Sequence, residues 1–405
     1  MPVLPFSIRI VPNQLLLVRQ NHPTAAALAY DALRQDLTRR CTRRVVARRV
    51  TGAMIFITGF PGFLGSRLVE RLAAKYPYSE FALLVQPKFV EQAQQELEFR
   101  GLAERSRLIP GDITKMDLGI REGRTQLQMS ITRAFHLAAV YDLSIDQRLA
   151  REINVDGTRH VLNFLEPCPR LEVFGYVSTA YVSGLREGAI FEDELVHDSG
   201  FKNYYEETKY EAEVLVEERK SVIPTVILRP SIVVGDSETG ETDKFDGPYA
   251  VLRVLRHLPG LTVMTRLGRG TRPVNVVPVD FVTRAMAHLT QPENAGTTFH
   301  LTDPEALSAQ EMVDIFLDLL DKRATFVSVP VPVARLAAGT PAGMVLGLTP
   351  EIVDYFDHPA YYDSSRTQKA LIGSGITCPR FADYAPHMLD YMLRHEQEKR
   401  TAAMY

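Results

Sequence analysis

The sequence contains no tryptophan and only three cysteines, Cys41, Cys168 and Cys378. No two of them are close in the sequence, so they provide neither a CxxC redox motif nor a zinc-binding motif. A sparse, odd number of cysteines is typical of a reducing compartment. We therefore expect a cytoplasmic protein with no metal site.

Long hydrophobic runs are also missing. No uninterrupted apolar run reaches about 18 residues, the length typical of a membrane-spanning helix. The most apolar long stretch, residues 331–349, is interrupted by Pro332, Arg335 and Pro341. We expect a buried helix with irregular ends there, with a lid or an interfacial segment as the alternatives.

An excess of positive charge is confined to the N-terminal segment of the chain. Residues 1–53 contain nine Arg and two Asp, a net charge of +7, which leaves −10 for the rest of a chain whose total is −3. The near-neutral total gives no reason to expect a nucleic-acid partner. We expect residues 1–53 to be a basic extension outside the fold, of the kind that an upstream start codon would add. The alternatives are an organelle transit peptide, or a tail that binds nucleic acid or a membrane surface.

From Met54 onward, short apolar segments alternate with helical patterns, notably at residues 153–165 and 205–218. This alternation is typical of a parallel sheet covered by helices on both faces. We predict an α/β fold with a Rossmann-type doubly wound parallel sheet. The predicted strands are 54–58, 81–85, 107–109, 134–137, 174–177 and 225–228.

The amino-acid composition changes after about residue 236, where Gly, Pro and Asp become frequent. We predict a dinucleotide-binding domain at 54–235 and a smaller, mostly helical, substrate-binding region at 236–405. Segments near 274–290 are expected to return to the first domain. The later elements predicted are a helix at 281–289, a strand at 299–301, and helices at 308–321 and 382–395.

A glycine-rich turn follows the first predicted strand. Its sequence is Thr58-Gly59-Phe60-Pro61-Gly62-Phe63-Leu64-Gly65. Glycine allows a tight turn and a close approach of the backbone to a pyrophosphate. The following helix offers unpaired N–H groups and the positive end of its dipole. Because the motif lies between a strand and a helix, it predicts nucleotide binding.

The end of the second strand bears on the choice between NAD and NADP. An acidic residue there favours NAD, and a basic neighbour accommodates the 2′-phosphate of NADP. Here Gln86 ends the strand and Lys88 follows. No carboxylate is present to repel a phosphate, so we favour NADP, with NAD as the alternative.

Tyr205 and Lys209 are four residues apart and share one face of a predicted helix. A nearby ammonium is expected to lower the pKa of a phenol, which can then exchange a proton with a substrate oxygen. Upstream, a predicted strand ends in Ser178 and Thr179. A hydroxyl there can hydrogen-bond a substrate carbonyl, and strand phase favours Thr179 over Ser178. We predict Thr179, Tyr205 and Lys209 as the catalytic residues.

Together these ordered motifs resemble the extended short-chain dehydrogenase/reductases, over most of residues 54–405. Further motifs shared with that superfamily are Gly111-Asp112, His136-Leu137-Ala138-Ala139, Asn154-Val155-Asp156-Gly157-Thr158 and Leu228-Arg229-Pro230-Ser231. The resemblance implies that Asp112, with Ile113, contacts adenine and that Ala138 and Ala139 follow the cofactor. It adds Pro230, Tyr205 and Lys209 to the cofactor-binding residues. His136, Asn154 and Arg229 also suit structural roles.

Within the superfamily the chain looks most like the fatty acyl-CoA reductase and thioester reductase branch. The likeness lies in residues 177–182, residues 228–235 and the stretch 376–381 with Tyr384. The branch reduces an acyl thioester to an aldehyde, sometimes onward to an alcohol, with NADPH, which implies acyl-CoA or an acyl carrier protein as a partner. The branch often has Arg where Gln86 stands, and this departure weakens the NADP assignment.

Three other functions stay open. A nucleotide-sugar epimerase or dehydratase would need a basic pocket, for which Arg266, Arg269 and Arg272 are the candidates. A hydroxysteroid-type or small-ketone dehydrogenase would share the same motifs. A non-enzymatic dinucleotide sensor would have no need for Thr179, Tyr205 and Lys209. The sequence leaves the oligomeric state open.

Overall fold

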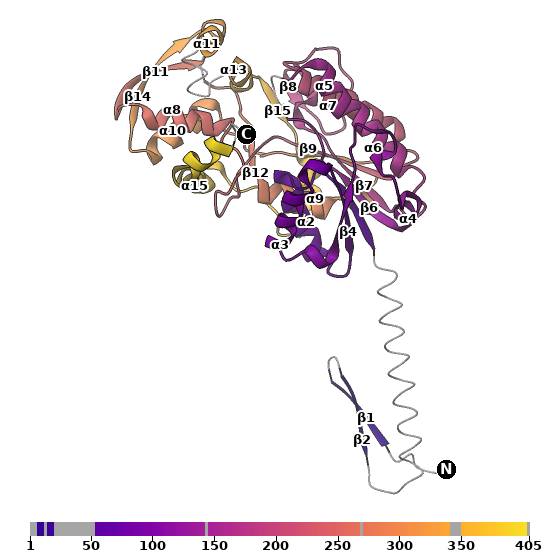
Figure 1. Ribbon diagram of the computed structural model, residues 1–405. Helices are drawn as coiled ribbons and strands as arrows, with labels where there is room; N and C mark the ends of the chain where they lie inside the picture. Colours follow the sequence, from indigo (N-terminus) through magenta and orange to yellow (C-terminus); the bar gives the residue numbers. More distant parts are fainter. Residues whose placement is uncertain are drawn as a thin grey trace. The chain divides into compact units, whose positions relative to one another are not determined.

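The centre of the protein is a seven-stranded parallel sheet with the order β13-β9-β7-β6-β3-β4-β5 (Figure 1). The computed structural model describes residues 6–11, 14–19, 53–141, 145–267, 270–340 and 350–402. The strands of this sheet are β3 (Met54–Thr58), β4 (Glu80–Val85), β5 (Ser106–Pro110), β6 (Ile131–His136), β7 (Val173–Val177), β9 (Thr225–Pro230) and β13 (Thr298–Leu301). The predicted Rossmann-type α/β fold is confirmed, and each predicted strand corresponds to one of these seven.

Strand order reverses next to β3. The chain runs outward through β4 and β5, then returns to the other side of β3 with β6 and continues outward through β7 and β9. In open parallel sheets, ligands bind in the crevice outside the carboxyl ends of the strands at such a switch point. The loops that leave β3 and β6 are therefore the place to look for a site.

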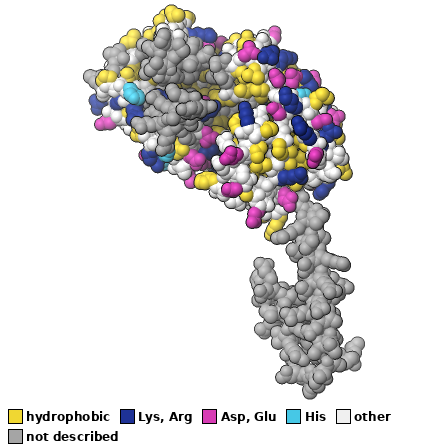
Figure 2. Space-filling view, in the orientation of Figure 1, with side chains coloured by type: hydrophobic (Ala, Val, Ile, Leu, Met, Phe, Trp, Pro, Cys, Tyr) yellow, Lys and Arg dark blue, Asp and Glu magenta, His cyan; other side chains and the backbone are white. Residues whose placement is uncertain are grey.

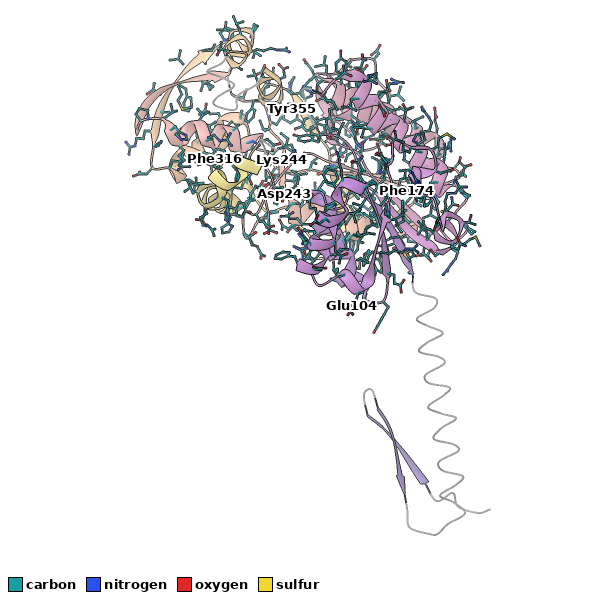
Figure 3. All side chains as sticks on the ribbon, in the orientation of Figure 1. Glu104, Phe174, Asp243, Lys244, Phe316 and Tyr355 are labelled. Carbon is teal, nitrogen blue, oxygen red and sulfur yellow. The ribbon has the colours of Figure 1, made fainter. Side chains whose placement is uncertain are left out.

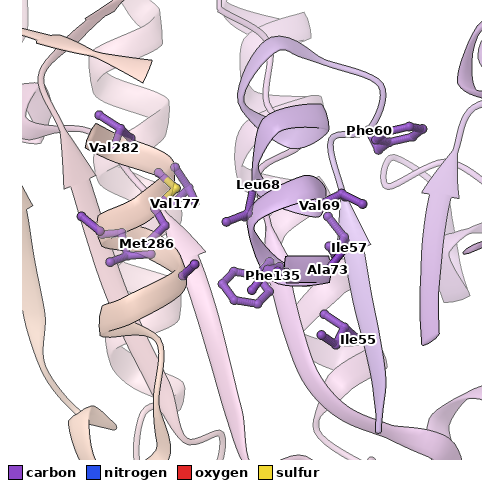
Figure 4. Close-up of a cluster of buried hydrophobic side chains, with 14 of the residues drawn as sticks. Ile55, Ile57, Phe60, Leu68, Val69, Ala73, Phe135, Val177, Val282 and Met286 are labelled. Carbon is purple, nitrogen blue, oxygen red and sulfur yellow. The ribbon is translucent and has the colours of Figure 1, made fainter. Parts of the chain in front are cut away.

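Helices cover both faces of the sheet because successive strand residues point to opposite faces and both sets are apolar. Ile55 and Ile57 face α2 (Phe63–Lys75) and α9 (Val279–Leu289), in a cluster that includes Leu68, Val69, Val282 and Met286 (Figure 4). Phe56 faces the opposite layer. That layer contains α4 (Arg124–Ser130), α6 (Gly157–Leu165) and α7 (Tyr204–Arg219). A fully buried aliphatic or aromatic side chain contributes about 1.5–3 kcal/mol, so the two clusters account for much of the fold's stability.

The later part of the chain forms a third apolar cluster of its own. Its main elements are α8 (Pro248–His257), β11 (Leu261–Leu267), α10 (Ala309–Leu319), β14 (Arg323–Val329) and α15 (Phe381–Ala402). β11 pairs with β14 in parallel, and two short parallel pairs, β10 (Ile232–Val234) with β12 (Val276–Pro278) and β8 (Gly188–Ile190) with β15 (Ala360–Tyr362), lie nearer the main sheet. This part is thus helical with small paired strands between the helices.

The expected buried helix in residues 331–349 is wrong for the part that the structure describes. Residues Val331–Ala338 form α11, but Val333 is 54% exposed and Leu336 is 77% exposed. The helix packs mainly against α13 (Pro350–Phe356), which covers only one side of it. Figure 2 shows hydrophobic side chains at the margin of the molecule where α11 lies. Residues 341–349 lie outside the described part of the chain.

The chain divides into two compact units, residues 1–52 and residues 53–405. Within the first, β1 (Phe6–Val11) pairs antiparallel with β2 (Gln14–Arg19). The arginine-rich segment 39–49 lies outside the described residues. No helix in the described ranges is long and apolar enough to cross a membrane, and their side chains form no group suited to a metal ion.

A buried ion pair ties α7 to the sheet. Arg229 of β9 donates to Glu213 Oε1 from Nε (2.9 Å) and Nη2 (2.5 Å), and their side chains are 1% and 0% exposed. Arg229 Nη1 also donates to the Glu194 carbonyl oxygen at 2.9 Å, and Glu213 accepts from the Ser178 hydroxyl. Arg229 therefore has a structural role here, one of the two that its sequence motif allowed.

Removing one member of this pair leaves a buried charge without compensation. We expect Glu213→Ala to lower the free energy of unfolding by about 3–5 kcal/mol. As a control, Glu166→Ala removes the partner of Arg219 from an exposed pair and is expected to cost less than about 1 kcal/mol. Urea titration of both variants measures the difference, and equal losses would contradict the structural role of the pair.

Candidate active site

The glycine turn lies at the carboxyl end of β3, at the switch point. Gly59 has φ +92°, and a Cβ on it would lie 2.8 Å from Ala138 N in the loop after β6. A Cβ on Gly65 would lie 2.3 Å from Gly59 O, so the first turn of α2 also needs glycine. Thr58 Oγ1 accepts from Ala138 N at 3.2 Å. The turn therefore packs tightly against the neighbouring strand end.

The N-terminus of α2 suits an anion. No side chain caps it, and its first turn contains no acidic residue. The first intrahelical bond runs from Ser66 N to Gly62 O, so the amides of Phe63, Leu64 and Gly65 precede the helical ladder. Phe60 is buried in the core, and Pro61 and Gly62 complete the turn. This arrangement fits the pyrophosphate of a dinucleotide.

The predicted adenosine-binding residues lie at the ends of the next two strands. Gln86 Nε2 donates to Asp112 Oδ2 at 3.1 Å, and Asp112 Oδ1 accepts from Thr114 N at 2.9 Å. Ile113 is buried against Gly157 of α6. Lys88 is exposed, with its Nζ 4.7 Å from the centroid of the Phe89 ring. Gln86 and Asp112 thus form one polar edge, with Lys88 beside it in sequence.

His136 joins the strands at the switch point. Its Nδ1 lies 2.7 Å from Thr58 Oγ1 and its Nε2 lies 3.1 Å from Thr158 Oγ1. Burial, with a smaller contribution from the Lys209 charge, lowers the pKa of His136 to about 3. The imidazole is therefore neutral and bridges two hydroxyl groups, which is a structural role. Ala138 is partly exposed and Ala139 is exposed in the loop that follows.

Asn154 connects that loop to the helix that carries the predicted catalytic residues. Its Oδ1 accepts from Val140 N at 3.0 Å, and its Nδ2 donates to Thr208 Oγ1 at 3.0 Å. Asn154 is 1% exposed. It lies in a short π-helical segment, Glu152–Asp156, that leads into α6. Thr208 is the residue before Lys209. The Asn154 side chain therefore holds this part of α7 next to the loop that follows β6.

The structure places Thr179 near Tyr205; these are the two residues that were predicted to bind a substrate carbonyl. Asn203 caps α7, accepting from Glu206 N at 3.0 Å, so Tyr205 lies in the first turn of the helix. The Thr179 side chain interacts with the Tyr205 hydroxyl and lowers its pKa. Thr179 Oγ1 also lies 3.4 Å from the carbonyl oxygen of Pro230, the remaining predicted cofactor-binding residue. Burial raises the pKa of Tyr205, and the interaction with Thr179 opposes this only in part.

Lys209 lies one turn further along α7, but its contacts differ from the expected ones. Its Nζ donates to Val177 O at 2.8 Å and to the Tyr176 hydroxyl at 3.2 Å. Burial lowers the pKa of Lys209 to about 8, against the opposing effect of Glu213. The sequence argument expected the ammonium to lower the pKa of Tyr205. In this structure burial dominates and the phenol stays protonated at neutral pH.

The sequence did not indicate Tyr141. Its ring meets the Tyr205 ring edge-on, with centroids 5.2 Å apart and planes at 88°. Tyr141 is 51% exposed, so it forms the solvent-facing side of this contact. Tyr141 follows β6 by five residues and lies 64 residues before Tyr205, so no local spacing links the two. Its place after a strand at the switch point is the signal that would have found it.

We expect Gly65→Ala to weaken binding of a dinucleotide, because the added Cβ displaces the turn that holds the α2 amides. Affinity for NADPH, measured by fluorescence titration, is expected to fall at least about tenfold, a loss of roughly 1.4 kcal/mol. Gly260→Ala is the matched control, since nothing lies within 4 Å of a Cβ there. Unchanged affinity in Gly65→Ala would contradict the assignment of the turn.

Comparisons with known proteins agree with this geometry. The profile of the family described as "Male sterility protein", an NAD-binding domain, matches residues 57–286, more than half of the chain. The crystal structure of the terminal R domain from the myxalamid PKS-NRPS biosynthetic pathway is 27% identical. It superposes with a TM-score of 0.72 over 85% of this chain and 91% of that one.

Curated relatives include larger enzymes. Human fatty acyl-CoA reductase 2 is 28% identical over 50% of this chain and 48% of its own length. The non-canonical nonribosomal peptide synthetase FrzA from Cladobotryum sp is 25% identical over 85% of this chain and 36% of its own length. The chain spans about half of these relatives or less. An NAD-bound UDP-glucuronic acid 4-epimerase from Bacillus cereus, at 21% identity and a TM-score of 0.60, shares the fold. By its sequence profile and its extended short-chain dehydrogenase/reductase fold, the chain belongs to the NAD-binding male sterility protein family.

Proposed function

We propose that the chain is an NADPH-dependent oxidoreductase that reduces an acyl thioester to an aldehyde. The observation that carries the proposal is the placement of Thr179, directly after β7, beside Tyr205 in the first turn of α7, where the Thr179 side chain lowers the pKa of the phenol. Two converging hydroxyls can bind one carbonyl oxygen. The fatty acyl-CoA reductase and R-domain relatives support a thioester as the carbonyl compound.

In the proposed reduction, Thr179 and Tyr205 bind the substrate and supply the proton. A nicotinamide held at the turn Gly59–Gly65 and by Lys209 would supply hydride for the thioester carbonyl carbon. Thr179 and Tyr205 hydrogen-bond the carbonyl oxygen, and Tyr205 gives it a proton as negative charge develops. Because burial raises the pKa of Tyr205, this proton is present throughout the neutral range. The resulting hemithioacetal releases the thiol of the carrier and leaves the aldehyde.

Lys209 places a positive charge one turn of α7 after Tyr205. Its bonds to Val177 O and the Tyr176 hydroxyl fix the ammonium on the face of α7 that also carries Tyr205. A positive charge there favours the electron-rich oxygen of the developing transition state. It also suits a hydrogen bond to the nicotinamide ribose, the role that the family resemblance implies.

The preference for NADP over NAD is part of the proposal. Gln86, the residue that follows β4, carries no negative charge. Its side-chain amide donates a hydrogen bond to Asp112 Oδ2. Lys88 is exposed two residues later, where a 2′-phosphate would need a cation. We propose that Lys88 serves in place of the Arg that the thioester reductase branch often has after its second strand.

The basic residues considered for a sugar diphosphate do not favour an epimerase. Arg266 Nη2 donates to Ser328 Oγ of β14 at 3.2 Å, within the β11–β14 pair. Arg272 is exposed, and residue 269 lies outside the described part of the chain. The likeness to epimerase structures below 25% identity extends to the fold alone.

A substrate panel tests the proposed function. Loss of the reduced-nicotinamide absorbance is followed with acyl-CoA thioesters, UDP-sugars and ketones, each with NADH and NADPH. We expect turnover with acyl thioesters and NADPH, and its loss in Tyr205→Phe while NADPH affinity is retained. Turnover with only ketones or sugar nucleotides would overturn the proposal, and silence with bound cofactor would favour a dinucleotide sensor.

The pKa of Lys209 predicts an alkaline limit to activity. Because burial lowers this pKa from 10.5 to about 8, the ammonium loses its proton as pH rises through that value. We expect kcat to fall with a single-proton slope above about pH 8. Lys209→Arg retains its charge at high pH, so its residual activity should lack this limb. An unchanged alkaline limb in Lys209→Arg would assign the titration to another group.

A further inference from the structure

Tyr355, a residue of α13, reaches the first turn of α7 from 152 residues away in the sequence. Its hydroxyl accepts from Asn203 Nδ2 at 3.1 Å, and it lowers the pKa of the Glu206 carboxyl group. Asn203 is the N-cap of α7, and Glu206 directly follows Tyr205. One phenol thus bonds the residue that caps α7 and acts electrostatically on the residue that follows Tyr205. Figure 3 shows Tyr355 between the sheet and the helices of the later part of the chain.

The first turn of α7 contains a second constraint, a buried ion pair. Lys202 and Glu206 have side chains that are 4% and 0% exposed, with Nζ 3.4 Å from Oε1. Lys202 Nζ also donates to Gly184 O at 3.1 Å, and Lys202 N donates to Glu206 Oε2 at 3.1 Å. A carboxylate this deeply buried needs donors or a cation nearby. The Tyr355 hydroxyl adds a favourable interaction from the later part of the chain, since it lowers the pKa of Glu206.

Tyr355 also contacts Tyr181, a neighbour of Thr179 in the sequence. Its ring meets Tyr181 edge-on, with centroids 4.8 Å apart and planes at 85°. Tyr181 N donates to Thr179 Oγ1 at 3.3 Å. One side chain therefore contacts the segment that carries Thr179 and the helix that carries Tyr205.

We propose that Tyr355 is a positioning residue, whose hydroxyl sets the first turn of α7 and thereby the direction of the Tyr205 hydroxyl toward Thr179. The inference rests on the proposed function. Tyr355 does not itself bond either hydroxyl of the pair in the described contacts. It acts through Asn203, Glu206 and Tyr181.

The position of Glu206 gives this role a pH signature. The groups that face Glu206 are Lys202, Tyr181, Tyr205, Tyr355 and Tyr362, and Lys202 is in turn near His358 and Asp354. Burial raises the pKa of Glu206, while Lys202 and the Tyr355 hydroxyl lower it. Removing that hydroxyl raises the pKa further, so the ion pair is lost at a higher pH. The acid limb of kcat should then move to higher pH.

Tyr355→Phe tests the proposal, with Tyr362→Phe as the matched control. Tyr362 lies in the same aromatic cluster, with its ring centroid 5.7 Å from that of Tyr181, and it also faces Glu206, but its hydroxyl is hydrogen-bonded to Ser183 rather than to the N-cap of α7. In Tyr355→Phe we expect kcat to fall on the order of 10- to 100-fold, as misplacement of a reacting group does. KM and NADPH affinity should stay within about twofold, and the acid limb should shift upward. Tyr362→Phe should keep the wild-type rate and pH profile.

Hydrogen exchange provides a readout that needs no substrate. Amides of residues 204–208 should exchange faster in Tyr355→Phe than in the wild type or Tyr362→Phe, measured on the full chain with NADPH bound. Wild-type kcat and exchange in Tyr355→Phe would overturn the proposal, as would equal losses in both variants with an unshifted acid limb. Inactivity of the wild type with every thioester would instead overturn the proposed function, and the exchange experiment would still decide whether Tyr355 orders α7.

Discussion

The reversal of strand order beside β3 is the constraint on which the rest of the structure depends. It brings the carboxyl ends of β3 and β6 side by side, and the loops that follow them are held together by short contacts. Gly59 approaches Ala138 so closely that no side chain fits between them. The neutral imidazole of His136 joins Thr58 to Thr158 across the same point. The uncapped N-terminus of α2 follows β3 through the glycine turn, at the place where open parallel sheets bind their ligands.

The helix α7 carries an unusual concentration of buried charge. Lys202 and Glu206 are buried at its start, and Lys209 and Glu213 follow on the face that packs against the sheet. Burying such groups costs free energy unless each has partners, and here Gly184, Val177 and Arg229 supply them. These bonds are directional, so they hold the helix in one rotation about its axis. A helix packed by apolar contacts alone would leave the direction of Tyr205 less well defined.

Much of the fold could be predicted from the sequence because parallel strands and their covering helices have strong local signatures. The apolar run Ile55–Ile57 indicates a buried strand, and the glycines of the turn Gly59–Gly65 indicate a tight backbone turn. The choice of Thr179 as a partner of Tyr205 came from its place at the end of a strand and stays a prediction. The contacts of Lys209 and the approach of Tyr141 and Tyr355 depend on tertiary packing between segments far apart in the chain. No periodicity encodes such contacts. The apolar composition of α11 likewise indicated burial, whereas the helix lies at a margin where few elements cover it.

The most direct test of the account is a crystal structure with NADP⁺ bound and a non-reactive thioester analogue in the crevice. The account predicts the pyrophosphate at the N-terminus of α2. It also predicts the analogue's carbonyl oxygen within hydrogen-bonding distance of both Tyr205 and Thr179, with its carbon roughly 3–3.5 Å from the nicotinamide C4. A complex in which the nicotinamide or the carbonyl lies away from the Tyr205 hydroxyl would contradict it.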